Sequence, residues 1–268
     1  MTICIAAACK DGTEPKIVVC TDSKTSSVLG SAEIAHKCVW LTEGWACLTA
    51  GIESDILALV RLYNILFKDE NNRKAENIDS TIKNALYQRR QDLSDEYIKH
   101  RFSISHDEFI SFGKEKLPPE VFFDATQKVS QIELNADLII TGFIDKAPEI
   151  YYTDSRGNCR AASHFAVVGE GEYIASSALL RRKQNDWISL EDTLYNVFEA
   201  KKLSESIGSV GHSTYMAVIP DDGSASLTSL ELDRQLNEWF IKYGPQPLPY
   251  KPKFEGNYYY NRKPNDGG

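Results

Sequence analysis

Features that would place the chain in a membrane or outside the cell are missing from the sequence. No apolar run reaches the roughly 18 to 20 residues that cross a bilayer, since the most apolar stretch, residues 56–67, is interrupted by Arg61 and Asn64. The N-terminal segment MTICIAAACKD has neither the basic start nor the longer apolar core of a secretory signal. We therefore expect a cytoplasmic protein with no membrane partner.

An excess of positive charge is also absent. The 268 residues include 30 lysines and arginines against 38 aspartates and glutamates, which gives a net charge of -8. Such a chain has no surplus cations with which to neutralise nucleic-acid phosphates. Nucleic acid is therefore excluded as the main partner, while the hydrophobic content of 42% is ordinary for a globular protein with a substantial core.

Metal-binding patterns are missing as well. The six cysteines form no CxxC pair and lie mostly in apolar, strand-like runs, where a thiol behaves as a small hydrophobe. None of the five histidines stands at metal-ligand spacing from another histidine or from a cysteine pair. The sequence predicts reduced core cysteines, no metal site and no cofactor.

The sequence does contain a series of short β-prone segments at its start. Apolar runs separated by turn residues predict strands over the first fifty residues, which we interpret as an antiparallel meander. The expected strands cover residues 3–9, 16–22, 28–34, 37–42 and 45–50, the last two joined by a tight turn at Glu43-Gly44.

Helical spacing of apolar residues begins after Gly51. The positions from Ile56 to Phe67 predict one buried helix, and residues 80–123 predict two or three more. Strands and helices then alternate again. The expected ranges are strands 136–144, 149–153 and 164–168, a helix over 172–183 and another capped by Ser189, strands 215–219 and 225–230, and a helix over 232–241.

This order of elements predicts an α+β fold in one domain. Blocks of antiparallel strands that alternate with helix pairs favour sheets covered by helices, and no flexible linker separates them. We assign this domain to residues 1–243. Residues 244–268 hold five of the ten prolines and several tyrosines, so we expect an extended Pro/Tyr-rich C-terminal tail there.

Three polar residues near the start of the chain stand out. Strand alternation places Asp22 and Lys37 each on an apolar face, the first with Val18 and Cys20 and the second with Val39 and Leu41. Because an unpaired buried charge is costly, we expect Asp22 and Lys37 to meet. Thr2, which becomes the first residue if Met1 is removed, starts a strand that fits between them.

Four N-terminal motifs carry a resemblance to a known family. They are TICIAAACKDG, IVVCTDSKT, AEIAHKCVWL and LTAGIESDILALVRLY, in that order. Together with LIITGFID, PEIYYTDSRGN, FAVVGEGEYIASSALL and YNVFEAKKLSESIGSVGHSTYMAVI, they make residues 2–230 resemble proteasome β-subunits and their bacterial relatives, including the ancestral beta-subunit group. The resemblance implies the four-layer αββα sandwich of the N-terminal-nucleophile (Ntn) hydrolases. It also implies assembly into a ring or another homo-oligomer, and it identifies no ATPase partner.

The resemblance further implies catalytic roles. Thr2 matches the nucleophile, whose own α-amine is freed by removal of Met1 and acts as general base; because the reference pKa of an α-amine is about 8, a usable fraction is neutral at neutral pH. Lys37 matches the lysine whose charge lowers the pKa of that amine, and Asp22 matches the acid that holds the lysine in place. Gly51 matches the glycine whose amide stabilises the oxyanion.

The downstream half departs from the family pattern. Gly169-Glu170-Gly171 has a glutamate where proteasome subunits have a serine, and an anion there would raise the pKa of the Thr2 amine unless Glu170 faces elsewhere. The family's next acidic residue and serine fall within residues 204–209, where Glu205 and Ser209 are the candidates. These departures leave catalytic competence open.

The leading hypothesis is an N-terminal-threonine hydrolase that cleaves an amide, most simply a peptide bond, through a Thr2 acyl-enzyme. The alternatives are a catalytically inactive proteasome-like scaffold or binding subunit, and an amidase acting on small non-peptide amides with the same fold. The site residues also have structural interpretations: Asp22 and Lys37 as an ion pair only, Gly51 as a turn with positive φ, and Glu170 as a solvated loop carboxylate.

Overall fold

The computed structural model describes residues 2–27 and 30–245 of the chain. The strands are β1 (Ile3–Asp11), β2 (Glu14–Thr21), β3 (Lys24–Ser27), β4 (Gly30–Glu33), β5 (Cys38–Thr42), β6 (Trp45–Gly51), β7 (Ala136–Ile144), β8 (Ala147–Thr153), β9 (Cys159–Ala161), β10 (Phe165–Gly169), β11 (Tyr215–Pro220) and β12 (Ser226–Leu227). The helices are α1 (Glu53–Leu66), α2 (Ile78–Phe102), α3 (His106–Lys116), α4 (Pro119–Ser130), α5 (Glu172–Arg181), α6 (Leu190–Ser204) and α7 (Leu230–Tyr243), with a short 3-10 helix, η1 (Glu70–Arg73).

The first antiparallel sheet has the strand order β10-β1-β2-β11-β12. Its central part is buried on both faces, which suits the unbroken run of small apolar residues in β1. Ile3 and Ile5 pack in the core formed with α5 and α6, whereas Cys4 and Ala6 pack in the core between the two sheets. The first sheet therefore lies between a helical layer and the second sheet.

The second antiparallel sheet has the order β5-β6-β7-β8-β9. One of its faces meets the first sheet through side chains such as Leu48 and Ile139, and the other packs on α1 and α2 through side chains such as Cys47 and Ile140. Alternation with a period of two along β6 and β7 thus divides their residues between two cores.

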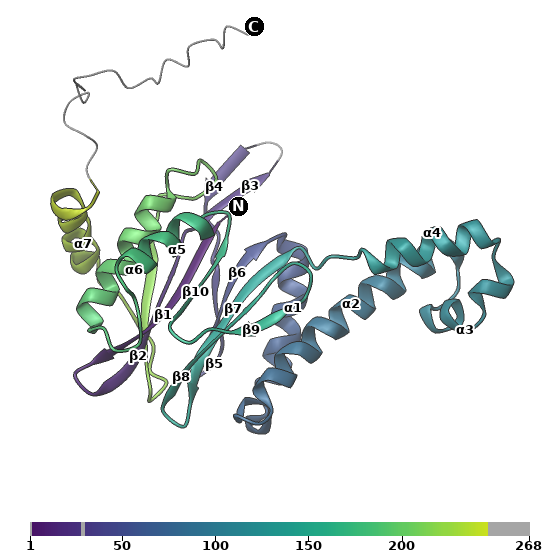
Figure 1. Ribbon diagram of the computed structural model, residues 1–268, viewed down its shortest axis with the longest axis horizontal. Helices are drawn as coiled ribbons and strands as arrows, with labels where there is room; N and C mark the ends of the chain where they lie inside the picture. Colours follow the sequence, from purple (N-terminus) through teal and green to yellow (C-terminus); the bar gives the residue numbers. More distant parts are fainter. Residues whose placement is uncertain (1, 28–29, 246–268) are drawn as a thin grey trace, which may run out of the picture.

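The layers follow in the order helix, sheet, sheet, helix (Figure 1). The helices α5, α6 and α7 cover the first sheet, and α1 and α2 cover the second. The predicted fold class, an α+β sandwich of two antiparallel sheets flanked by helices, is confirmed. The order of elements also agrees with the strand and helix blocks expected from the sequence, including the hairpin of β11 and β12 and the final helix.

The prediction of one antiparallel meander over the first fifty residues is wrong. β1 and β2 pair in the first sheet, β3 and β4 form a separate two-stranded sheet, and β5 and β6 belong to the second sheet. β3 was not expected, while the expected strand 28–34 is represented by β4, with residues 28–29 outside the described part. Local patterns locate most strands but not their sheets, because partner choice depends on contacts far along the chain.

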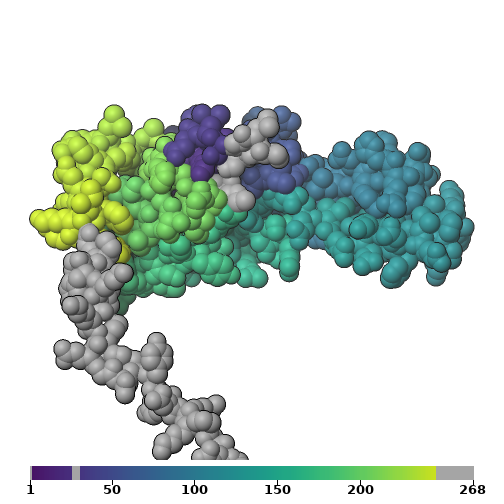
Figure 2. Space-filling model, turned by 90° about the horizontal axis from the view of Figure 1, so that it is seen from above, coloured from purple at the N-terminus to yellow at the C-terminus, as the bar shows by residue number. Residues whose placement is uncertain are grey.

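A helical arm extends from the second sheet. α2 is 25 residues long, and its distal part stands clear of the sandwich together with α3 and α4 (Figures 1 and 2). A separate small core holds these helices together, with Ile98, Phe109 and Ala125 fully or almost fully buried. The helical prediction for residues 80–123 is therefore confirmed, and the arm formed by α2, α3 and α4 is an addition to the four layers.

The domain boundaries stay a prediction. The expected domain over residues 1–243 matches the extent of the sandwich and its arm, but most of the expected tail, residues 246–268, lies outside the described residues, as does Met1. Within residues 2–27 and 30–245, no helix is long and apolar enough to cross a membrane.

Candidate active site

Asp22 is the buried centre of the candidate site. It directly follows β2, and its side chain has no exposed surface. Its Oδ1 accepts hydrogen bonds from the Ile3 amide at 3.0 Å and from Lys37 Nζ at 2.9 Å. Its Oδ2 accepts from the amides of Lys24 at 3.1 Å and Gly211 at 2.8 Å. Four donors, three of them from other segments of the chain, therefore hold the carboxylate in position.

Thr2 and Lys37 meet at this carboxylate. Thr2 directly precedes β1 and is 3% exposed, and Lys37 directly precedes β5 and is 8% exposed. The Thr2 hydroxyl donates a hydrogen bond to Asp22 Oδ1 and accepts one from Lys37 Nζ. The structure thus brings all three residues together, and the expected contact between Asp22 and Lys37 is confirmed.

The charge of Asp22 follows from these contacts. Burial alone would raise the pKa of its carboxyl group, but hydrogen bonds from the Thr2 hydroxyl, the Ile3 amide and Lys37 together hold the pKa below its usual range. Asp22 is therefore a carboxylate at neutral pH and balances the charge of the Lys37 side chain.

The main chain of Lys37 is held by β6. The Thr49 amide donates to the Lys37 carbonyl at 2.8 Å, and the Thr49 hydroxyl donates to the same oxygen at 3.3 Å. Two residues further on, Gly51 ends β6 with φ +128°, and a Cβ there would lie 2.2 Å from the Asn135 carbonyl oxygen. The structural interpretation of Gly51 as a position of positive φ is confirmed. Its role as an oxyanion donor stays a prediction, and the residue is exposed just ahead of α1.

Gly169 brings the end of β10 against Thr2. It is paired with Ile3 and has φ +100°, and a Cβ at this position would lie 2.4 Å from the Thr2 carbonyl oxygen and 3.2 Å from Thr2 Cγ2. Only glycine combines this backbone conformation with so close an approach. The Gly169-Glu170-Gly171 turn therefore lies beside Thr2, and its first glycine is a site residue that sequence reasoning treated only as part of a motif.

Glu170, the central residue of this turn, contacts Ser209. Glu170 is exposed, and its carboxylate accepts a hydrogen bond from the Ser209 hydroxyl. Within residues 2–27 and 30–245, neither side chain is hydrogen-bonded to Thr2. The structure places both at the rim of the site, and their catalytic roles stay predictions.

Glu205 lies in a cluster of basic groups. Its carboxylate accepts from Lys201 Nζ at 2.5 Å and from Lys202 Nζ at 3.0 Å, and it lies 3.0 Å from His212 Nδ1. Burial alone would raise the pKa of Glu205, but the hydrogen bonds from Lys201 and His212 hold it below its usual range. In the described part of the chain, Glu205 is hydrogen-bonded to these side chains and not to Thr2.

Gly211 is a site residue that the sequence did not reveal. Its amide donates to Asp22 although the two residues are 189 positions apart. A Cβ on residue 211 would lie 2.9 Å from Asp22 Oδ2, so the loop approaches this closely only with glycine. A glycine in a loop was the single signal in the sequence, and it does not specify a partner.

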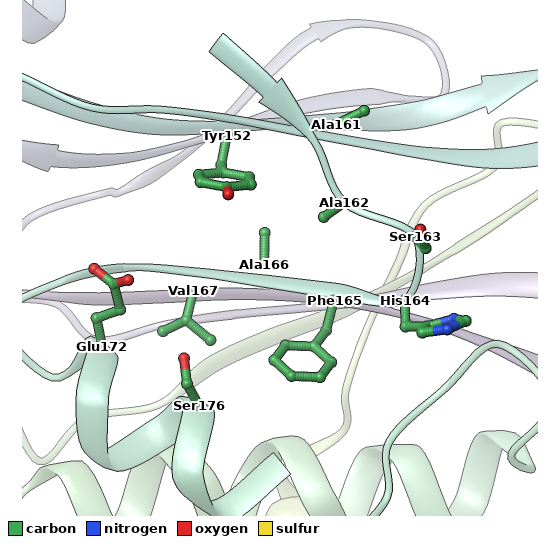
Figure 3. A pocket seen from close by; sticks show the side chains of 10 residues that line it. All are labelled: Tyr152, Ala161, Ala162, Ser163, His164, Phe165, Ala166, Val167, Glu172 and Ser176. Carbon is green, nitrogen blue, oxygen red and sulfur yellow. The ribbon is translucent and has the colours of Figure 1, made fainter. Parts of the chain in front are cut away.

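A cavity of about 380 Å³ lies along β10 (Figure 3). Figure 3 shows the Tyr152 ring pointing into it from β8, above Ala166 and Val167, with Glu172 and Ser176 on α5 below. Burial raises the pKa of Glu172, and the negative charge of Asp137 adds to this effect. The cavity lies along the strand that ends at Gly169, and its lining does not include Thr2, Asp22 or Lys37.

Within the part of the chain that the structure describes, no group of three or more His, Cys, Asp or Glu side chains is placed to hold a metal ion. The chemistry that Thr2, Asp22 and Lys37 can perform is nucleophilic. A hydroxyl beside a lysine and a buried carboxylate can lose its proton to a nearby base, and the lysine charge favours the resulting alkoxide.

Comparison with known proteins supports a relationship to proteasome subunits. The family model described as proteasome subunit matches residues 113–229, which include Glu170, Glu205 and Ser209 but not Thr2, Asp22 or Lys37. No significant match to a curated protein was found.

Among solved structures, the chain is similar to the Anbu (Gly-1) mutant from Hyphomicrobium sp. strain MC1. The TM-score is 0.59 at 18% sequence identity, and the likeness covers 90% of this chain and 94% of that chain. At this identity the likeness shows a shared fold, and it extends over the N-terminal strands that the family model does not reach. The family match over residues 113–229 and the shared fold together support a relationship to proteasome-like β-subunits.

Proposed function

We propose that the chain is an N-terminal-threonine hydrolase that cleaves an amide bond, most simply a peptide bond, after removal of Met1. The observation that carries this proposal is the buried contact of the Thr2 hydroxyl with Lys37 and Asp22. Stability is a weak reason for burying these charges, because a buried ion pair often adds little to stability compared with apolar residues of similar volume. Catalysis is a better reason, because a lysine beside a hydroxyl suits a nucleophile whose oxygen develops negative charge.

The proposed reaction begins with the α-amine that Thr2 gains when Met1 is lost. The neutral amine takes the hydroxyl proton as Thr2 Oγ1 bonds to the substrate carbonyl carbon. Lys37 stabilises the alkoxide, and the Gly51 amide stabilises the oxyanion. The protonated amine then gives its proton to the leaving nitrogen as the C–N bond breaks. Water, deprotonated by the same amine, finally attacks the carbonyl carbon of the Thr2 ester. The bond from that carbon to Thr2 Oγ1 breaks, Thr2 Oγ1 takes the proton back from the amine, and the acid is released.

The wider setting of this activity is also part of the proposal. The match to the proteasome-subunit model and the shared fold support self-association into a ring or another homo-oligomer, with a peptide or a small amide as substrate. We further propose that the chain acts in the cytoplasm.

A catalytically inactive scaffold or binding subunit is the second candidate. Two observations favour it: Glu170 occupies the turn beside Thr2 where the family has a serine, and Glu205 is engaged by Lys201 and Lys202. A retained Met1 would block the Thr2 amine and would decide for this candidate.

Intact-mass measurement of the natively purified protein tests the first requirement. We expect a mass lower than that of the full translated chain by one methionine residue. A protein in which every molecule keeps Met1 would contradict the proposed hydrolase, because the Thr2 nitrogen would then lie in a peptide bond and could not act as the base.

Covalent labelling tests the nucleophile itself. An epoxyketone should add to the processed protein, and peptide mapping should place the adduct on Thr2. The Thr2→Ala variant should lose the adduct, whereas Thr126→Ala, which removes an exposed hydroxyl on α4, should keep it. An adduct that survives Thr2→Ala would overturn the assignment of the nucleophile.

A further inference from the structure

Three consecutive amides in one loop bind two carboxylates from other parts of the chain. The loop covers residues 208–213, between α6 and β11, and we call it the 208–213 loop. The Gly211 amide donates to Asp22 Oδ2 at 2.8 Å. The next two amides, of His212 and Ser213, donate to Glu33 Oε1 and Oε2, each at 2.7 Å. Asp22 and Glu33 therefore accept hydrogen bonds from neighbouring amides of the same loop.

Glu33 belongs to an element that lies outside both large sheets. It is the last residue of β4, in the two-stranded hairpin with β3, and it is exposed. The same hairpin reaches the loop a second time, since Lys24 Nζ donates to the Gly208 carbonyl at 2.6 Å. The Lys24 amide also donates to Asp22 Oδ2. The hairpin thus contacts both the carboxylate of the site and the loop that binds it.

We propose that Glu33 is a positioning residue for the candidate active site: by binding the His212 and Ser213 amides, it sets the 208–213 loop so that the Gly211 amide orients the Asp22 carboxylate toward Thr2 and Lys37. This inference rests on the proposed function for its catalytic meaning. The hydrogen bonds from the loop to Asp22 and Glu33 do not depend on that function.

The contact between Glu33 and the loop is a strong one. Hydrogen bonds in which the acceptor is ionised are shorter and stronger than neutral ones, and Glu33 accepts two of them on separate oxygens. Hydrogen bonds from Ser213 and from the His212 amide lower the pKa of Glu33 to about 2, so its side chain is anionic at neutral pH.

The position of the loop is critical because Gly211 packs tightly against Asp22. A Cβ on residue 211 would meet Asp22 Oδ2 at 2.9 Å and Lys24 Cβ at 2.7 Å, so small shifts of the loop change the hydrogen bond to Asp22. The loop is also held by Lys201 Nζ, which donates to the His212 carbonyl at 2.8 Å. Glu33 adds a second contact to the loop, from the hairpin.

The test compares Glu33→Ala, which removes both acceptors, with Glu33→Gln, which keeps one acceptor oxygen and the shape. The first readout is the NMR titration of the Asp22 carboxyl carbon, which needs no catalysis. We expect the pKa of Asp22 to rise in Glu33→Ala, because a weakened Gly211 hydrogen bond no longer favours the charged form. We expect a smaller rise in Glu33→Gln and none in Glu231→Ala, a control on the exposed face of α7.

The second readout is the rate of epoxyketone addition to Thr2 as a function of pH. In Glu33→Ala we expect the rate to fall about tenfold. The midpoint of its pH profile should move upward by about half a unit, since a less firmly held Lys37 lowers the pKa of the Thr2 amine less. A residue with a purely structural role would reduce the amount of folded protein without moving this midpoint.

The outcomes separate the inference from the proposed function. If Glu33→Ala folds and both the Asp22 titration and the pH midpoint match those of the parent protein, the positioning role is wrong. If Glu33→Ala does not fold, the same comparison in Glu33→Gln decides. If the parent protein forms no Thr2 adduct, the proposed function fails, and the Asp22 titration alone then confirms or rejects the role of Glu33.

Discussion

Asp22 and Lys37 form a buried ion pair, and such pairs are sensitive to the loss of one partner. Asp22→Asn would leave the Lys37 charge buried without a counter-ion, so we expect a loss of about 3–5 kcal/mol in the free energy of unfolding. Urea denaturation measures this change. Adding Lys37→Met should recover most of the loss, because a buried pair replaced by apolar or neutral groups is close to neutral in stability. A double variant no better than Asp22→Asn would contradict the pairing.

The pH dependence of unfolding tests whether the charge of Asp22 causes the difference between the parent protein and Asp22→Asn. The pKa of Asp22 is lower in the folded protein than its ordinary value. Its charge therefore stabilises the fold fully above the unfolded pKa of about 3.9, and this contribution is lost as the pH falls through the folded value. The difference in unfolding free energy between the parent protein and Asp22→Asn should thus be constant near neutral pH and shrink below about pH 4. A difference that persists at lower pH would mean that the carboxylate charge is not its cause.

The sequence predicted the meeting of Asp22 and Lys37 for a reason that the structure revises. Alternation assigned the two residues to the faces of Val18 and Leu41, which belong to different cores on opposite outer sides of the sandwich. They meet because both lie just outside their strands, after β2 and before β5, where the pleat no longer fixes the direction of a side chain. The cost of burying a charge was a better guide than strand alternation.

Gly169 ends β10 beside Thr2 in a conformation with positive φ. Gly169→Ala would place a Cβ 2.4 Å from the Thr2 carbonyl oxygen at φ +100°. We expect a destabilisation of about 2–4 kcal/mol, since the strain of the backbone and the clash add. The matched control is Gly12→Ala, where φ is +61° but nothing lies within 4 Å, so that a loss of about 1 kcal/mol is expected. Thermal or urea unfolding distinguishes the two, and equal losses would contradict the close approach.

Elements were easier to predict than the contacts between them. The limits of β7 agree with the expected strand over residues 136–144, and Ser189 caps α6 as expected through a bond from the Asp192 amide. Such features depend on periodicity and on a capping residue, which are local. Glu33, by contrast, binds amides 179 and 180 positions away from the short strand β4, and no local pattern specifies a partner at that distance. The motif over residues 204–209 predicts Glu205 and Ser209 as site candidates, but it leaves their register open.

The layered architecture of the whole molecule could be predicted from the resemblance to a family, but the direction of the arm could not. Helical spacing identified α2, α3 and α4, while nothing in that spacing says that they leave the second sheet and pack on one another. The arm has its own core around Phe109, whose ring stacks on Phe102 with centroids 6.0 Å apart and lies 5.0 Å from the Phe122 centroid. The buried residues of this core are separate from those of the three cores of the sandwich.

Because the core of the arm is separate from the cores of the sandwich, we expect the arm to unfold independently of the sandwich. Phe109→Ala should cost the arm about 3–5 kcal/mol, because it empties a fully packed position. Hydrogen exchange should then accelerate in α3 and α4, while β1 and β6 keep their protection and Thr2 keeps its rate of epoxyketone labelling. Phe112→Ala is the matched control, since Phe112 lies on the same helix and is 50% exposed, so exchange should change little. Acceleration that spreads to β1 and β6 would show that arm and sandwich unfold as one cooperative unit, and the site would then depend on the arm for its stability.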